Sequence, residues 1–559
     1  MAYRHALCFI GGMGTKRIWA SLDPFFEQGP VMGRTQANAA FLDGLLRLDP
    51  YDAYRFYLPS RAACEALRAE LMRRHPSLVE GGRVEVATRR SLPAALAADD
   101  HHVFHLSDCI MTPGFLAALR NARSGQIFPI TSVTHSLSYA RYGQDFLKHL
   151  SPCTSPRDAV VATSRAGAEV VRGYYRSLRD GYGLDPDRFP EPRVEHIPLG
   201  VDLGGYSPPD DAARQAARVG AGYGGETVFL VLARLCHSSK MDFLPILRAF
   251  QRVLRDGAPR EGVRLVLAGW TDEEDWGRRA LEDMARNIGL PFTVEERPSH
   301  ERKLLLYAAA DVFLSPSDNL QETFGLTLLE AQAMGLPVIA SDFDGYRDLV
   351  RHEATGLLVP TTGLGVTSEV DLLAPLSFDN HTHLLLAQRL AVDVPTLAEA
   401  IARLAGDAGL RREMGLRARA GMAGYSWESI AARHVELWER LREQPAPRRG
   451  APAHPVAVPY AAVFGSYPSH SLETSPPLVL SRLGNAVYRG QDFPVVYEGL
   501  EGVLPMESLR PLLVLARKPQ PALALCERLC AADPLVREEQ ARALVLWCLK
   551  HDLLERSRG

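Results

Sequence analysis

The stretch that decides the fold is "QETFGLTLLEAQAMGLPV", which runs from Gln321 to Val338. It holds two glutamates, Glu322 and Glu330, eight positions apart with no other charged residue between them. The preceding "DVFLSPS" (311–317) has the apolar and β-branched residues of a buried strand, and Gly335 is a typical helix stop signal. The pattern predicts a strand, a loop with Glu322, a helix with Glu330, and a second strand over 337–342.

Short apolar runs alternate with helical patterns along most of the chain, as they do in parallel sheets with crossover helices. A first series of expected strands is separated by helical stretches such as 61–74, 113–122 and 165–178, and a second series follows it. The expected strands lie at 5–12, 53–59, 83–88, 102–107, 130–135 and 158–164, and then at 227–234, 263–269, 292–296, 311–317, 337–342 and 356–360. We therefore predict an α/β protein with two doubly wound, Rossmann-like domains that face each other across a cleft.

Changes of composition suggest the domain boundaries. We expect an N-terminal, acceptor-side domain over 1–202 and a second domain over 203–443, whose terminal helices can pack back on the first. A Pro-rich stretch, 444–459, is typical of a linker, and 460–559 then forms a small α+β domain that weakly resembles a winged-helix module. Its acidic and basic residues are nearly balanced, which favours recognition of a protein or acceptor, or dimerisation, over nucleic-acid binding.

Composition excludes several classes of protein. The chain has 559 residues, of which 46% are hydrophobic and 23% charged, and its formal net charge is -3. No strong overall charge attracts nucleic acid or an anionic membrane. The eight cysteines are scattered without a secretory signal, which is typical of reduced thiols in the cytoplasm. We expect a cytoplasmic protein, with the basic helix over 61–75 as a candidate for peripheral contact with a membrane.

The opening stretch also predicts an anion site. Open α/β sheets bind ligands beyond the carboxyl ends of their strands, and the free N–H groups at the start of a helix attract phosphate. Glu322 and Glu330 can then bind hydroxyl groups on either side of a diphosphate. Cations are expected at the same edge because "LARLCHSSKMDF" follows a strand. The residues concerned are Thr323, Phe324, Gly325 and Leu326 for the amides, and Arg234 and Lys240 for the cations.

These motifs, in this order, resemble the donor domain of the GT-B glycosyltransferases of family 4, the retaining nucleotide-sugar enzymes. The resemblance covers Thr227 to about Pro360. It rests on "ETFGLTLLE" with the following "AQAMGLPVIASDFDGYRDLV", and on "LARLCHSSK", "YAAADVFLSPS" and "ATGLLVP". The first half is similar more loosely, through "TSVTHS", "VVATSRAGAEVV" and "HIPLGVD".

The resemblance implies an activity and a set of site residues. A glycosyl group would move from a nucleoside diphosphate sugar, most simply a UDP-sugar, to an acceptor hydroxyl with its anomeric configuration retained, without a metal or another cofactor. Catalytic roles would fall to His135, Arg234, Lys240 and Glu322. The donor would also contact Gly33, Thr323, Phe324, Gly325, Leu326 and Glu330, the last through its ribose.

Other interpretations stay open. The same architecture serves nucleotide-sugar epimerases, and a copy without activity could bind sugar nucleotides while the C-terminal domain binds a protein. The acceptor could be a small molecule, a glycan, a lipid or a protein, and a homodimer is compatible with the sequence. The His- and Asp-rich stretches 99–106 and 379–386 lack the spacing of a zinc site, and Cys526 and Cys530 are expected to face a helical core.

Two segments depart from the family pattern. "FIGGMGTKRIWASLDPFFEQGPVMGRTQANAAFL" (9–42) places a long polar and aromatic stretch before Gly33, where the family has a short glycine loop after its first strand. The connection over 361–395 is longer than usual, and the sequence assigns it no role.

Overall fold

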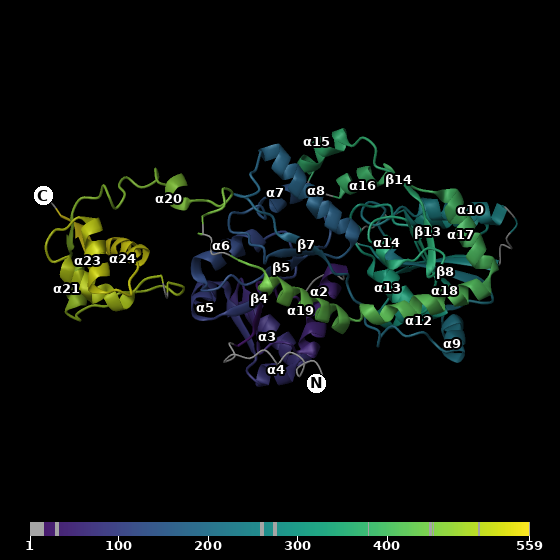
Figure 1. Ribbon diagram of the computed structural model, residues 1–559, viewed down its shortest axis with the longest axis horizontal. Helices are drawn as coiled ribbons and strands as arrows, with labels where there is room; N and C mark the ends of the chain where they lie inside the picture. The colour runs from purple at the N-terminus through teal and green to yellow at the C-terminus, as the bar shows by residue number, and fades with distance from the viewer. Residues whose placement is uncertain are drawn as a thin grey trace. The chain divides into compact units, whose positions relative to one another are not determined.

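The chain folds as two units in the computed structural model. The structure describes residues 16–27, 33–255, 257, 262–271, 277–377, 380–446, 450, 452–500 and 503–557. By its internal contacts the chain divides into Met1–His454 and Pro455–Gly559, and Figure 1 labels the elements of both. The division falls within the predicted linker.

The first α/β domain is built on a parallel sheet of seven strands in the order β3-β2-β1-β4-β5-β6-β7. Its strands are β1 (Ile18–Ser21), β2 (Ala53–Leu58), β3 (Val84–Thr88), β4 (His101–Leu106), β5 (Ile130–Val133), β6 (Ala159–Ala162) and β7 (Arg193–His196). Its helices are α2 (Gly33–Leu48), α3 (Arg61–Arg74), α4 (Pro76–Glu80), α5 (Leu92–Ala98), α6 (Pro113–Arg123), α7 (Tyr142–Leu147) and α8 (Arg165–Tyr182). The predicted sheet class is confirmed.

The sequence analysis missed the central strand β1. The strand expected over 5–12 lies outside the described residues, and Ile18–Ser21 lies at the centre of the sheet, within the stretch interpreted as an insertion. This strand is only four residues long, too short for a clear periodicity. Its burial comes from tertiary packing, because the Trp19 ring lies among the rings of Phe25, Tyr54 and Phe56.

The second α/β domain has six parallel strands in the order β10-β9-β8-β11-β12-β13. The strands β8 (Thr227–Arg234), β9 (Val263–Trp270), β10 (Phe292–Glu296), β11 (Val312–Ser315), β12 (Val338–Ser341) and β13 (Gly356–Val359) lie where the sequence predicted them. The helices are α9 (Asp211–Ala221), α10 (Leu244–Arg255), α11 (Arg278–Ile288), α12 (His300–Ala309), α13 (Leu326–Ala333), α14 (Tyr346–Leu349), α17 (Val394–Gly406) and α18 (Ala408–Ala420). The prediction was accurate because most of these strands are buried and rich in β-branched and aliphatic residues, which gives near-continuous apolar runs in the sequence.

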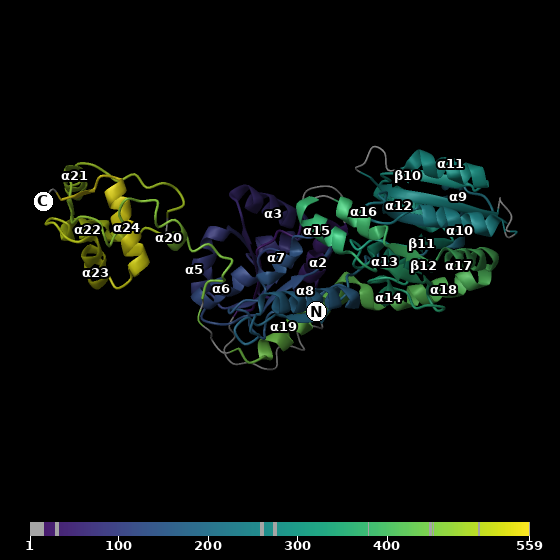
Figure 2. The same cartoon turned by 90° about the horizontal axis from the view of Figure 1, so that it is seen from above.

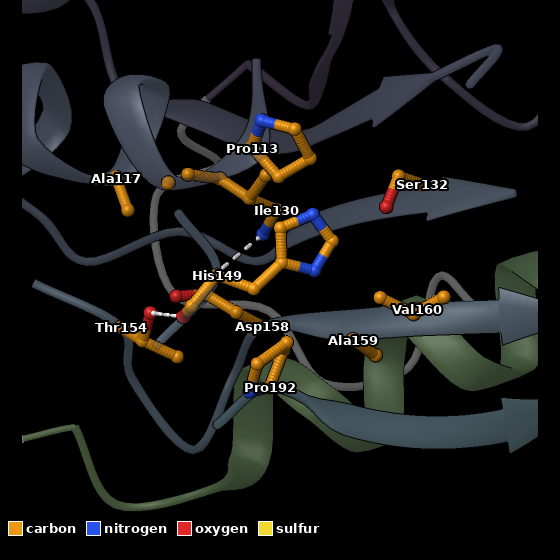
Figure 3. Close-up of a pocket in the computed structure, with 11 residues that line it drawn as sticks. Pro113, Ala117, Ile130, Ser132, His149, Thr154, Asp158, Ala159, Val160 and Pro192 are labelled. Carbon is orange, nitrogen blue, oxygen red and sulfur yellow. Dashed lines mark hydrogen bonds between the residues drawn. The ribbon is translucent and has the colours of Figure 1, made fainter. Parts of the chain in front are cut away.

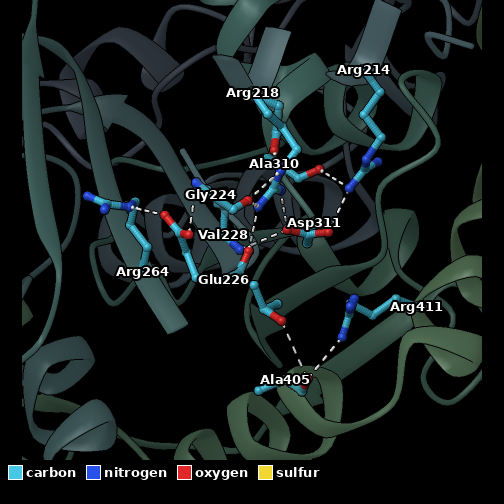
Figure 4. Close-up of polar contacts among 12 residues, drawn as sticks. Arg214, Arg218, Gly224, Glu226, Val228, Arg264, Ala310, Asp311, Ala405 and Arg411 are labelled. Atoms are coloured by element: carbon cyan, nitrogen blue, oxygen red, sulfur yellow. Dashed lines mark hydrogen bonds and ion pairs between the residues drawn. The ribbon is translucent and has the colours of Figure 1, made fainter. Parts of the chain in front are cut away.

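Hydrogen bonds and ion pairs stabilise the amino ends of the strands in this second sheet (Figure 4). Asp311 precedes β11 and accepts hydrogen bonds from Arg214 and Arg218 of α9 at 2.6 and 2.9 Å. It also accepts one from the Val228 amide of β8 at 2.8 Å. These charges are paired at the edge opposite the carboxyl ends of the strands, so their role is structural.

The last helix of the first unit, α19 (Trp427–Glu443), returns to the first α/β domain and packs on α2 (Figures 1 and 2). The indole Nε1 of its Trp438 donates to Thr131 Oγ1 of β5 at 2.8 Å. The chain therefore crosses between the two α/β domains twice, once after β7 and once before α19, which ties them into one unit.

The C-terminal unit is mainly helical. It contains α20 (Tyr460–Val463), α21 (Arg482–Tyr488), α22 (Leu509–Leu515), α23 (Ala522–Ala532) and α24 (Glu538–Lys550), with an antiparallel ribbon of β16 (Leu478–Leu480) and β17 (Leu554–Arg556). Cys526 and Cys548 are buried in its core, and burial raises the pKa of their thiols to about 11 and about 12. Within the described ranges of both units, no helix has the length and apolar composition needed to cross a bilayer.

We predict opposite effects for two glycine-to-alanine changes in helices. A Cβ on Gly44 of α2 would lie 2.9 Å from the Trp427 carbonyl oxygen, whereas a Cβ on Gly173 of α8 would meet nothing within 4 Å. Gly44→Ala should lower the unfolding free energy by about 1–3 kcal/mol through overpacking, and Gly173→Ala should raise it by up to about 1 kcal/mol through helix propensity. Denaturant unfolding measures both, and equal effects of the two changes would contradict the described packing of α19 on α2.

Candidate active site

Loops at the carboxyl edge of the second sheet form the candidate site. Arg234 ends β8, and the segment that follows it carries Lys240. The loop after β11 is held against that segment, because Asn319 Nδ2 donates to the Ser238 carbonyl and Ser317 Oγ to the Lys240 carbonyl, both at 2.9 Å. Residues that follow two different strands are thereby fixed side by side.

The centre of the site is an ion pair between Lys240 and Glu322. The Glu322 carboxylate also accepts from the Tyr346 hydroxyl at 3.1 Å and lies 3.3 and 3.4 Å from the amides of Thr323 and Phe324. Burial and the Arg234 charge lower the pKa of Lys240 to about 7, and the Asp344 carboxyl opposes this effect. The Glu322 carboxylate in contact also favours the charged amine. A carboxylate therefore lies against a largely buried lysine and backbone amides just before α13.

Gly325 makes this arrangement possible. Its φ is 102°, a left-handed conformation that favours glycine. A Cβ at this position would lie 2.5 Å from Cε1 of Tyr346. The glycine lets the chain turn sharply into α13 while the Tyr346 ring stays beneath Glu322.

Arg234 adds a second positive charge. Its Nη1 lies 3.3 Å from Ser239 Oγ and 3.4 Å from Gln321 Oε1, both neutral partners. Nearby carboxyls carry less negative charge than their number suggests, because burial raises the pKa of Asp318 and of Asp344 to about 7. The edge is thus suited to an anion.

Glu330 lies on a separate part of α13. Its carboxylate accepts hydrogen bonds from the hydroxyls of Tyr206 and Tyr307, both at 2.8 Å, and from Lys303 Nζ at 2.7 Å. The side chain is buried, at 8% exposure. A carboxylate has about four acceptor positions, so these three donors orient Glu330 and leave it capacity for one more partner.

His135 follows β5 at the carboxyl edge of the first sheet. Its Nε2 donates to the Ser107 carbonyl at 2.8 Å, and the Ser107 amide and hydroxyl donate to Asp23 at 2.9 and 3.1 Å. Burial lowers the pKa of His135, which favours a neutral ring with Nδ1 as an acceptor. Asp23 belongs to the loop after β1, which the sequence analysis missed, and burial raises the pKa of its carboxyl.

At Gly33 the start of α2, in the first domain, lies close to the start of α13, in the second domain. Gly33 is the first residue of α2, and a Cβ on it would lie 3.8 Å from Cδ1 of Leu326, the first residue of α13. Of the residues predicted for the site, Lys240 and Glu322 are in contact, and Arg234 lies beside their loops. Gly33 of the first domain lies near Leu326, at the start of the same helix. His135 contacts its own domain, and Glu330 has its own set of donors.

Further contacts join the two α/β domains. Gln321 Nε2 donates to the Tyr139 hydroxyl at 2.5 Å, and the Arg165 amide at the start of α8 donates to Asp348 at 2.7 Å. Ser164 Oγ donates to Asp344 at 3.4 Å. Sequence reasoning missed these residues. For Ser164, Arg165, Asp344 and Asp348 the signal is a position at a strand end within "VVATSRAGAEVV" and "SDFDGYRD", but only the folded chain reveals which partners meet.

A cavity elsewhere in the first domain has a structural explanation. It holds about 20 Å³, room for about one water molecule, and is lined by residues such as His149 and Asp158 (Figure 3). Both are already bound: His149 contacts Tyr175 and the Cys109 carbonyl, and Asp158 pairs with the buried Arg120. In the parts of the chain that the structure describes, no three His, Cys, Asp or Glu side chains are grouped as metal ligands.

Comparisons with known proteins show which sequences and folds this chain resembles. Residues 226–373 match the family model described as Glycosyl transferases group 1. The structure is similar to Anabaena HepE solved in complex with UDP, with a TM-score of 0.51, 16% identity, and coverage of 76% of this chain and 100% of that one. A glycosyltransferase from Rickettsia africae gives a TM-score of 0.50 at 13% identity, with coverage of 77% and 100%. The chain has the GT-B fold.

Curated relatives extend the sequence similarity beyond the family model. The D-inositol 3-phosphate glycosyltransferase of Nocardia farcinica is 33% identical over 273 residues, which cover 47% of this chain and 51% of the relative. The enzyme of the same name from Kineococcus radiotolerans is 32% identical over 280 residues, covering 49% and 57%. The chain thus spans about half the length of these relatives. The sequence similarity to these glycosyltransferases therefore covers about half of this chain.

Asp344 should make stability depend on pH. Its raised pKa of about 7 means that the folded state keeps a proton that the unfolded state releases above its ordinary value of 3.8. This contribution to the unfolding free energy is therefore lost as the pH rises from about 4 to about 7. Asp344→Asn removes the ionising group, and asparagine tolerates the φ of 46° at this position.

We therefore expect the difference in melting temperature, Asp344→Asn minus wild type, to increase between about pH 5 and about pH 7 and to stay constant above that. Asp342→Asn, at a partly exposed position two residues earlier, is the matched control for the loss of one carboxylate from the same loop. A constant offset between Asp344→Asn and the wild type at every pH would contradict a raised pKa at Asp344.

Proposed function

We propose that the protein is a retaining glycosyltransferase that moves a sugar from a nucleoside diphosphate sugar, with UDP as the first nucleotide to test, to an acceptor hydroxyl in the cytoplasm. The observation that carries the proposal is the meeting of Arg234, Lys240 and Glu322 at the start of α13. A diphosphate needs just such a combination of cations and helix amides. UDP in the HepE complex and the group 1 match support the choice of ligand.

Donor binding would exchange one anion for another. In the structure the Glu322 carboxylate lies against Lys240 and the amides of Thr323 and Phe324. A diphosphate carries more negative charge, so it would take over Lys240, Arg234 and the amides that follow, including those of Gly325 and Leu326. Glu322 would then turn to hydroxyl groups of the transferred sugar, and Gly33 at the start of α2 would leave room for the phosphates.

Glu330 would bind the ribose through its remaining acceptor position. Tyr206, Lys303 and Tyr307 hold its carboxylate in one orientation, so ribose hydroxyls would meet an acceptor that needs no rearrangement. Such preorganisation favours binding because little side-chain freedom is lost. Substitution of Lys303 would therefore disturb nucleotide binding through the orientation of Glu330.

Departure of the nucleoside diphosphate is the step that this site would promote. Negative charge develops on the leaving phosphate oxygen as the glycosidic bond breaks, and Arg234, Lys240 and the α13 amides would stabilise it. The acceptor hydroxyl would attack from the face that the leaving group occupied and give its proton to the leaving phosphate oxygen, which preserves the anomeric configuration. The two cations would do the work for which other enzymes use a metal.

The first α/β domain would present the acceptor. Its carboxyl edge places neutral His135 and the Asp23–Ser107 pair within one hydrogen-bonded chain, which is suited to hydroxyl groups. His135 would lie beside the transferred sugar. A cyclitol phosphate of the kind named for the curated relatives is the first acceptor to test, and the C-terminal unit would recognise a protein or acceptor.

We predict that Lys240→Ala and Glu322→Ala separate donor binding from turnover. Lys240→Ala removes a cation from the diphosphate and should weaken UDP binding, measured by calorimetry, by at least about tenfold. Glu322→Ala should leave UDP bound but reduce release of UDP from UDP-glucose by about 10²- to 10³-fold, because sugar contacts are lost. Arg286→Ala, an exposed cation on α11, is the control and should change neither. Near-normal turnover in both the Lys240→Ala and the Glu322→Ala variants would contradict the proposal.

A panel of nucleotide sugars separates the proposed activity from its alternatives. With a cyclitol phosphate acceptor we expect free UDP and an α-linked product from an α-linked donor, detected by proton NMR, and no change after treatment with EDTA. Release of an epimerised nucleotide sugar without acceptor would indicate an epimerase. Binding without any product across the panel would indicate a sugar-nucleotide-binding protein.

A further inference from the structure

The segment between β13 and α17 forms a distinct hairpin. Strands β14 (Thr361–Gly363) and β15 (Leu390–Val392) pair antiparallel, and α15 (Ser368–Ser377) and α16 (His381–Ala387) lie between them. We call this segment the inserted hairpin. In both views α16 lies at the junction of the two α/β domains (Figures 1 and 2), although the hairpin belongs to the second.

One side chain of α16 reaches the first domain. His383 is 1% exposed, and its Nε2 lies 2.8 Å from Ser138 Oγ. Its ring stands edge-on to the Tyr139 ring, with centroids 4.9 Å apart and planes at 88°. Burial lowers the pKa of His383, so the ring is neutral. The hairpin thus makes a specific polar and aromatic contact with the loop that follows β5.

That loop connects the hairpin to the candidate site. His135 lies three residues before Ser138 in the sequence, and the Tyr139 hydroxyl accepts from Gln321 Nε2 at 2.5 Å. Gln321 in turn contacts Arg234 at 3.4 Å and immediately precedes Glu322. The contacts therefore lead from His383 of the hairpin, in the second domain, to Ser138 and Tyr139 of the first domain. From Tyr139 they return to Gln321 in the loop before α13.

We propose that His383 is a positioning residue that holds the 136–139 loop of the first domain against Gln321, and so sets the place of His135 relative to Glu322. The functional part of this inference rests on the proposed glycosyl transfer. The Nδ1 atom of His383 has no hydrogen-bond partner among the described residues. A buried ring with one unsatisfied nitrogen costs stability, so simple filling of a core favours an aliphatic side chain here, and the histidine is explained by its contact with Ser138.

Hydrogen exchange on the full chain tests the contact without any ligand. His383→Ala should speed exchange of amides in residues 134–141 and 319–324 by about 3- to 10-fold, the effect of losing one neutral hydrogen bond on local opening. The strands β8 and β9 should not change. His381→Ala, at an exposed position two residues earlier on the same helix, is the matched control and should leave both loops unaffected.

Two further variants separate the polar contact from packing. The side-chain amide nitrogen of glutamine can occupy the place of a histidine Nε2, whereas that of asparagine reaches only the place of Nδ1. His383→Gln should therefore restore slow exchange in the 134–141 loop, and His383→Asn should not. Equal behaviour of the Gln and Asn variants, or wild-type exchange in His383→Ala, would overturn the proposal.

Turnover tests the functional part. His383→Ala should change the Kd for UDP by less than about threefold, because the diphosphate ligands lie on the second domain. It should reduce kcat for release of UDP from UDP-glucose by about tenfold or more, since small misplacements of site residues slow reaction strongly. Faster loop exchange with unchanged kcat would overturn the positioning role. If the wild type neither binds UDP nor cleaves UDP-glucose, the proposed function fails, while the exchange measurements still decide whether the contact holds the loops.

Discussion

The candidate site is organised around one ion pair, between Lys240 and Glu322. Lys240 and Glu322 come from loops after two different strands and meet at the start of α13, where Thr323 and Phe324 amides also face the carboxylate. Burial makes an isolated lysine charge costly, so Lys240 needs an anion whether or not a ligand is bound. Glu322 supplies that anion in the structure. A diphosphate, which carries more negative charge, would compete with Glu322 for the same lysine.

The surrounding chain keeps this pair in place. Gly325 turns tightly into α13 with the Tyr346 ring beneath it, and the Tyr346 hydroxyl contacts Glu322. From the first domain, Gly33 at the start of α2 lies near Leu326, and the Tyr139 hydroxyl accepts a hydrogen bond from Gln321. The inserted hairpin adds His383 to the same loop. The contacts that join the two α/β domains therefore also hold residues of the candidate site in place.

Sequence reasoning located the second sheet and placed Lys240 and Glu322 at the same edge of it, because buried parallel strands form apolar runs and their carboxyl ends lie at one edge. It missed the short strand β1, whose Trp19 packs among rings from β2 and the β1–α2 loop. It also could not foresee the three donors on Glu330, or the contact of His383 with Ser138, which lie 245 positions apart in the sequence. Those partners share no local pattern, and only the folded chain brings them together.

The central claim is that a nucleoside diphosphate binds at the start of α13 in place of the Glu322 carboxylate. A crystal structure of the protein with UDP tests it most directly. The account predicts that the diphosphate lies between Arg234, Lys240 and the amides of Thr323 to Leu326, with Lys240 released from Glu322. A nucleotide bound elsewhere, or one bound while the Lys240–Glu322 pair remains intact, would contradict it.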